Sequence, residues 1–271
     1  MYNLKENRRH LRATMIDEKE AVMKNAFLCH VFAMLSMAAV AIGQDAKPRH
    51  EAARIEHTQQ NIEGWIVHVD TRLVGEEEEV GRRALKILAN KLVSIKLVMP
   101  KKPLEELQQV PIWIDLDHKL RVMQYHPSAD WLKEHGYDTK MTKVVHIPNA
   151  RGFVGHQKSN DQPWVVLHEL AHAYHDRFLS FDNPRIKEVY REAVKDGQYE
   201  SVLHISGKMQ RHYALTDDKE YFAEGTEAFF GTNDFYPFVR AELKRHDPKL
   251  YELLEDVWDR KRERGRQTAR D

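Results

Sequence analysis

Apolar and polar residues follow one period in the first part of this chain and another in the second. Before residue 160, short apolar stretches at 65–70, 112–116 and 144–147 are rich in β-branched residues, and the first of them alternates with polar positions after Gly64. Such stretches are typical of β-strands. After residue 160, apolar positions recur at helical spacing. This pattern predicts helices over 163–180, 184–197, 199–209, 218–230 and 235–260.

Two more helices are expected among the strands. The segment 75–99 carries an apolar stripe at steps of one, three and four residues, and Pro100 breaks it. A short helix is expected within 126–136, where Ser128 can cap the first turn. Strands that precede helices predict an α+β fold, with a small N-terminal lobe that contains a sheet and a mostly helical C-terminal half.

The most apolar run, residues 26–43, has the features of a secretion signal. A lysine follows Met23 as a positive start, and the run ends in Ala-Ile-Gly, a small-x-small pattern typical of a signal-peptidase site. We therefore expect translation to start at Met23 and the exported mature chain to start near Gln44. An uncleaved membrane anchor or a buried helix is the alternative, because a transmembrane helix needs about 20 apolar residues. The expected organisation is a mis-called extension at 1–22, a signal peptide at 23–43, a polar lead-in at 44–60, a single domain at 61–260 and a charged tail at 261–271.

The charge of the chain argues against nucleic acid as its partner. The 271 residues include 42 Lys+Arg and 42 Asp+Glu, so the formal charges cancel, whereas binding to nucleic acid calls for a basic surface. The sole cysteine, Cys29, lies in the apolar run and leaves the mature chain without a disulfide. The exported protein therefore depends for its stability on core packing and on any bound metal.

The segment 168–172, His-Glu-Leu-Ala-His, carries the clearest chemistry. In a helix, His168 and His172 are four positions apart, project side by side and can bind one zinc ion. Glu169 lies one position round, where it can take a proton from the attacking water. Asp161 and Pro163 suit the start of such a helix. Catalytic zinc keeps three protein ligands, so a third must come from elsewhere in the chain.

Glu220, Glu224 and Glu227 are the obvious donors of that ligand. Steps of four and three residues place them on one face of the predicted helix at 218–230, and a bound cation would relieve their mutual repulsion. A ligand histidine usually donates its second ring N–H to a carboxylate, which suits Glu220 and Glu224 as ligand and supporting residue, in either order. A glutamate ligand and the lack of an HxxGxxH extension after His172 indicate a gluzincin rather than a metzincin.

The sequence around these residues resembles the lethal-factor-like gluzincins, a family that includes the proline–proline endopeptidases. In that family HExxH is followed by a tyrosine seven residues before a glutamate that opens an E-aromatic-F-A-E sequence, and Tyr213 and 220–224 match this pattern. The resemblance implies a zincin-like fold and one catalytic zinc. It further implies that Glu220 is the third ligand, that Glu224 hydrogen-bonds a ligand, and that Tyr213 stabilises the oxyanion. It covers only 164–176 and 213–230, so no substrate specificity is implied.

Three features near the motif complete the expected site. Asp176, one turn beyond the second histidine, either orients a ligand, braces the helix that bears the glutamates, or lies on the helix surface. His175 is expected to lie off the metal face, and Glu227 is expected to be structural. In zincins, a strand beside the active-site helix pairs with extended substrate through backbone groups, and the segment 144–154 is the candidate for that strand.

The sequence as a whole predicts an exported zinc metallopeptidase whose substrate is a protein or peptide. Two alternatives would use the same zinc site: a hydrolase of a non-protein amide such as a cell-wall cross-link, and a catalytically silent zinc-binding module. Glu169 and Tyr213 favour an enzyme, because a structural zinc site needs neither. Cleavage of the signal peptide would leave the protein without a stable membrane association.

Overall fold

The computed structural model describes residues 55–259, apart from the side chains of 157–159. The expected extension at 1–22, the signal peptide at 23–43 and the charged tail at 261–271 lie outside the described residues. Within the described part of the chain, no helix combines the length and the apolar character needed to span a membrane.

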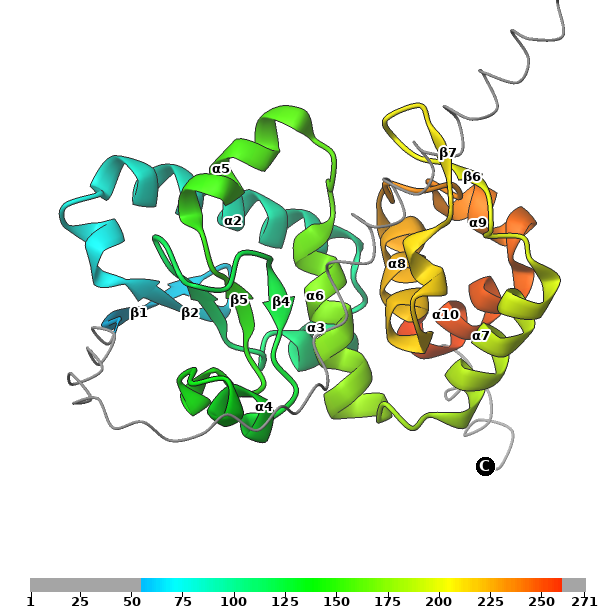
Figure 1. Cartoon of the computed structure of the whole chain (residues 1–271), viewed down its shortest axis with the longest axis horizontal. Coiled ribbons are helices and arrows are strands. Elements are labelled where there is room, and N and C mark those ends of the chain that lie inside the picture. The colour runs from blue at the N-terminus through cyan, green and yellow to red at the C-terminus, as the bar shows by residue number, and fades with distance from the viewer. Residues whose placement is uncertain (1–54, 260–271) are drawn as a thin grey trace, which may run out of the picture. The chain divides into compact units, whose positions relative to one another are not determined.

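A five-stranded sheet with the order β1-β2-β3-β5-β4 occupies the first part of the described chain (Figure 1). Its strands are β1 (His57–Ile62), β2 (Trp65–Asp70), β3 (Ile112–Ile114), β4 (Gln124–Tyr125) and β5 (Val145–Ile147). β1 and β2 form an antiparallel hairpin, β2, β3 and β5 run parallel, and β4 is antiparallel to β5. The strands predicted at 65–70, 112–116 and 144–147 are confirmed.

Strand β1 begins within the segment 44–60, which was expected to be a polar lead-in. Residues 57–60 of that segment belong to the strand. The strand carries no apolar run, since it lies at the edge of the sheet and pairs with β2 through main-chain groups. Glu63 and Gly64 form the two-residue turn of the hairpin with φ of 54° and 101°. Two positive φ angles are the requirement of a type I′ hairpin turn.

Helices make up most of the remaining chain. They are α2 (Glu78–Val98), α3 (Lys101–Leu107), α4 (Ala129–Glu134), α5 (Ala150–Ser159), α6 (Val165–Tyr174), α7 (Pro184–Asp196), α8 (Asp218–Phe230), α9 (Arg240–His246) and α10 (Pro248–Asp259). The helices predicted at 75–99, 184–197 and 218–230 are confirmed as α2, α7 and α8. Ser128 caps α4 as expected, because its hydroxyl accepts a hydrogen bond from the Trp131 N–H at 3.2 Å. The α+β architecture is therefore confirmed.

Several expectations about the helices were wrong. The segment 199–209 is a hairpin of β6 (Val202–Leu203) and β7 (Met209–Gln210) instead of a helix, with Gly207 at a φ of 82°. The predicted helix at 235–260 is two helices that break at Asp247, because the proline that follows disfavours a helical conformation there. Helices α3 and α5 were not predicted.

The start of the active-site helix also differs from the prediction. α6 begins at Val165 with Trp164 as its N-cap and without a side-chain cap, so neither Asp161 nor Pro163 has the expected role. At its other end α6 passes into a π-helix, His175–Leu179.

The two faces of the sheet bury different kinds of residue. The inner face joins α2 and α6 in the main core and contributes Val67, Val69, Ile112, Ile114, Val145 and Ile147. The outer face carries the row His68, Trp113 and His146, which are in register across β2, β3 and β5. Since side chains alternate along a strand, this row points away from the main core. Helix α6 lies between the sheet and α8 (Figure 1).

Candidate active site

The packing of α6 against α8 brings both histidines of the HExxH segment to Glu220. The Nε2 atoms of His168 and His172 are 3.1 Å apart, and Oε2 of Glu220 lies 3.0 Å from the first and 3.2 Å from the second. Burial alone would raise the pKa of the Glu220 carboxyl, but hydrogen bonds from the two histidines outweigh it and lower that pKa. Two imidazoles and one carboxylate thus converge on a single point.

Local sequence explains why Glu220 reaches this point. Asp217 caps α8, and its Oδ1 accepts hydrogen bonds from the N–H groups of Lys219 at 2.8 Å and Glu220 at 3.0 Å. Side-chain oxygens of this kind satisfy the free N–H groups at a helix start. Tyr221 and Phe222, both fully buried, hold the first turn in the core. Glu220 therefore lies in the first turn of α8, half-buried and directed at α6.

Glu169 is held by the edge strand of the sheet. Its Oε2 accepts a hydrogen bond from the Tyr125 N–H of β4 at 2.8 Å, and the side chain is largely buried. Burial raises the pKa of the Glu169 carboxyl, partly offset by the neighbouring His168 and His172. A carboxylate with a raised pKa beside a ligand pair is well placed to accept and return a proton.

Tyr213 lies in a short 3-10 helix, Tyr213–Leu215, just before α8. Its hydroxyl donates to Oε1 of Glu220 at 3.4 Å, and 40% of the residue is exposed. Burial of the phenol and the nearby Glu220 charge raise its pKa, so the hydroxyl keeps its proton at neutral pH. The structure thus brings the Tyr213 hydroxyl to Glu220, one of the three candidate ligands, with a proton available for hydrogen bonding.

A carboxylate behind His168 is the contact that the sequence did not reveal. Nδ1 of His168 bonds Oε1 of Glu227 at 2.8 Å, whereas Glu224 lies 3.6 Å from the same nitrogen, beyond hydrogen-bond length. Glu227 was expected to be structural, and Glu224 was expected to support a ligand. Helical spacing could have indicated this contact, because Glu227 lies two turns from Glu220 on the same face of the helix. Burial raises the pKa of the Glu224 carboxyl, reinforced by the charge of Glu227.

Asp176 connects the end of α6 to the sheet. Its Oδ2 accepts hydrogen bonds from the Tyr125 hydroxyl at 2.6 Å and from the Lys143 ammonium. These contacts brace β4, the strand whose backbone holds Glu169. His175 is fully buried and packs against the rings of Phe181 and Phe222, off the metal face.

The edge strand beside α6 is β4, and the expectation for 144–154 was wrong. Val145 and His146 of β5 pair with β3 on one side and with β4 on the other, so backbone groups of β5 are already used. The second part of that segment is helix α5. β4 is the last strand of the sheet and contacts α6.

The donor set fits a zinc ion. Two imidazoles and one carboxylate are a common ligand set for catalytic zinc, which keeps a further position open. With a metal on Nε2, the Nδ1–H of His168 would donate its hydrogen bond to Glu227, which is the usual way in which a ligand histidine is oriented. Three carboxylates lie close together at this site: Glu220, Glu169 and Glu227, which lies behind His168. A bound cation would balance their negative charge.

The fold and this donor set together define the class of zincin-like metalloproteases. The family model of anthrax toxin lethal factor, N- and C-terminal domain, matches residues 50–257, and the chain belongs to this family. Lethal-factor-like zincins use zinc, in agreement with the candidate metal-binding groups of the described residues. Comparison with the curated proteins and with the solved structures found no match.

Proposed function

We propose that this chain is an exported zinc metallopeptidase of the gluzincin type that hydrolyses peptide bonds. Its membership of a metalloprotease family supports a hydrolase that acts on proteins or peptides. The observation that carries the proposal is the convergence of His168, His172 and Glu220 within 3.2 Å beside the buried Glu169.

Each of these residues has a chemical role in the proposed reaction. His168, His172 and Glu220 would hold one zinc ion, which when bound polarises a peptide carbonyl and makes water more acidic. Glu169, fixed by the backbone of β4, would take the proton from the attacking water and return it to the leaving amine. The Tyr213 hydroxyl would donate a hydrogen bond to the oxyanion, where negative charge develops.

A peptide library tests the proposal directly. Residues 44–271 and the variant Glu169→Gln would be loaded with zinc, and cleavage would be mapped by mass spectrometry. The wild type should cleave, and the variant should lose about 10²–10⁴-fold in rate while its zinc content stays the same. Equal cleavage by both proteins would refute the role of Glu169 and assign the cleavage to another agent.

The other outcomes of this experiment identify the alternatives. Cleavage of cell-wall material by a zinc-loaded protein that spares peptides would show a hydrolase of a non-protein amide. A folded, zinc-loaded protein that cleaves neither would be a silent binding module. Export is tested separately by sequencing the N-terminus of the protein from its native host: a start near Gln44 supports cleavage of the signal, and a start at Met23 or Met1 refutes it.

A further inference from the structure

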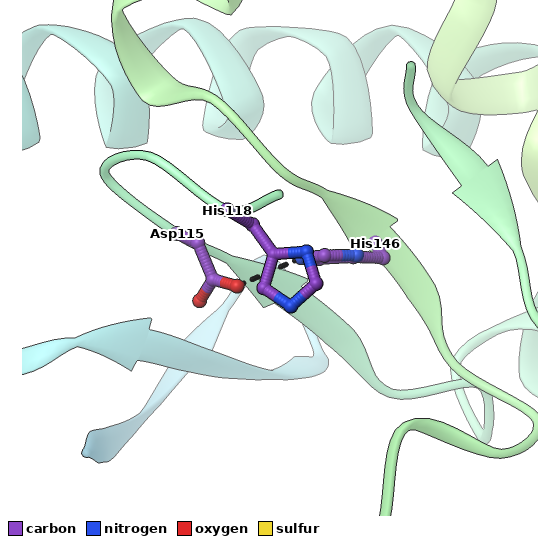
Figure 2. Close-up of side chains that lie close together, drawn as sticks. All are labelled: Asp115, His118 and His146. Atoms are coloured by element: carbon purple, nitrogen blue, oxygen red, sulfur yellow. Dashed lines mark hydrogen bonds and ion pairs between the residues drawn. The ribbon is translucent and has the colours of Figure 1, made fainter. Parts of the chain in front are cut away.

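A second cluster of metal-binding side chains lies on the outer face of the sheet. Figure 2 shows Asp115, which follows β3, together with His118 from the next loop and His146 from β5. One potential ligand atom of each residue lies within 4.8 Å of the other two. Asp115 and His146 are 1% and 0% exposed, whereas His118 is half-buried and leaves the cluster open to solvent on its side.

Histidines surround the buried carboxylate of Asp115. Its Oδ2 is 2.8 Å from Nε2 of His146, and its Oδ1 is 2.6 Å from Nε2 of His57. Nδ1 of His146 lies in turn 3.3 Å from Nε2 of His126. Within residues 55–259, Asp115 forms ion pairs with His57 and His146 alone. A buried carboxylate needs a positive partner, and a cation bound by the surrounding imidazoles would supply one.

We propose that Asp115, His118 and His146 form a second metal site, which takes Zn²⁺ or a divalent ion of similar ligand preference. Imidazole nitrogens and a carboxylate oxygen are the ligands that such ions favour. Two of the ligands already have an outer partner that would orient them. His57 donates to the second oxygen of Asp115, and His126 can accept the N–H on the far nitrogen of His146.

The alternative to a metal site is a hydrogen-bonded network of the same residues, and the two states differ at His118. Its Nδ1 accepts a hydrogen bond from the Leu120 N–H at 3.1 Å. A metal on Nδ1 would occupy the same lone pair, and a metal on Nε2 would place the proton on Nδ1, facing the amide. Binding through either nitrogen therefore breaks the Leu120 contact, whereas the network preserves it.

Occupancy of this site would stabilise the strand that serves the active site. Asp115 and His146 lie on neighbouring strands, and His126 directly follows Tyr125, whose N–H holds Glu169. A metal ion here would fix the ends of β3 and β5 to the loop that leads into β4. The site is separate from the HExxH centre, because the two groups of candidate ligands share no residue. The inference holds whatever reaction occurs at α6.

Counting tight zinc sites tests the proposal. The full chain and three variants would be stripped with a chelator and titrated with Zn²⁺ against a chromophoric competitor, which reports only the tight sites. We expect two equivalents for the wild type, one for His118→Gln and one for His168→Gln. His135→Gln, which changes an exposed histidine stacked on Trp131, is the matched control and should retain two.

The same variants allow a readout that does not depend on stoichiometry. In His168→Gln, which retains only the second site, addition of Zn²⁺ should remove the hydrogen-exchange protection of the Leu120 amide. His118→Gln should show no such response. If the wild type and His118→Gln bind the same number of ions, or if the Leu120 amide does not respond in His168→Gln, the cluster is a hydrogen-bonded network and the proposal fails.

Discussion

Replacing Glu227 by glutamine should weaken zinc binding without emptying the site. The variant retains the shape of the side chain but removes the negative charge that lies 2.8 Å from Nδ1 of His168. The side chains of His168 and Glu227 are mostly buried, with 10% and 6% of their surface exposed, so water cannot replace the contact. A hydrogen bond to a charged group contributes about 1.5–3 kcal/mol, and a factor of ten in affinity corresponds to about 1.4 kcal/mol. We therefore expect zinc affinity to fall about 10–100-fold, the range typical of residues that orient a ligand.

Glu224→Gln is the matched control for this prediction. It removes a carboxylate from the same helix at the same depth, but one that lies 3.6 Å from Nδ1 of His168. Competition titration with a zinc chelator would measure both variants, and circular dichroism would show that both are folded. Glu224→Gln should lose less affinity than Glu227→Gln. A larger loss for Glu224→Gln would refute the reasoning from distance and support the role that the family resemblance implies for Glu224.

Three further predictions concern the reaction and the stability of the fold. Tyr213→Phe should lower kcat about 10²–10³-fold with unchanged zinc content, and a loss of zinc would contradict its assignment to the oxyanion. Gly81→Ala should destabilise the protein by about 1–3 kcal/mol in urea denaturation, although alanine favours helices, because the added Cβ would lie 1.8 Å from the Leu73 carbonyl oxygen; unchanged stability would refute this. Burial, aided by His172, lowers the pKa of His175 from 6.5 to about 4. The unfolded chain therefore binds the proton more readily, and stability should be complete above pH 6.5 and fall by up to about 3 kcal/mol towards pH 4. His175→Phe should flatten this pH dependence in urea denaturation, and an unchanged slope would show that other groups cause it.

The chemistry of α6 was predictable from sequence because it depends on one local rule. His168 and His172 are four residues apart in a single helix, so their side chains meet whatever the rest of the chain does. The same rule placed Glu220, Glu224 and Glu227 on one face of α8. It could not decide which glutamate reaches which histidine, because that depends on how the two helices cross. The observed crossing puts Glu220 between the two Nε2 atoms and Glu227 behind His168.

The missed elements have physical reasons of the same kind. Strand β1 pairs through backbone groups at the sheet edge, so its polar side chains gave no apolar signal. The sequence of 199–209 alternates too little to predict a strand, whereas pairing of β6 with β7 decides its conformation. The break at Asp247 has a signal in the sequence, the following proline, which disfavours a helical conformation at the residue before it.

The cluster at Asp115 shows why sites on sheets are harder to find than sites on helices. Its three candidate ligands come from positions 115, 118 and 146, and only the parallel pairing of β3 with β5 places the first beside the last. Strand order cannot be obtained from spacing along the chain, because parallel neighbours need a crossover of arbitrary length. A single peptide of β4 then separates this cluster from the HExxH centre: Tyr125 holds Glu169 at the edge of the sheet through its N–H, and the His126 side chain contacts His146 on the outer face. A substitution at His126 should therefore alter the contact with His146 on the outer face. It should change the active site only if it displaces β4, whose Tyr125 N–H holds Glu169.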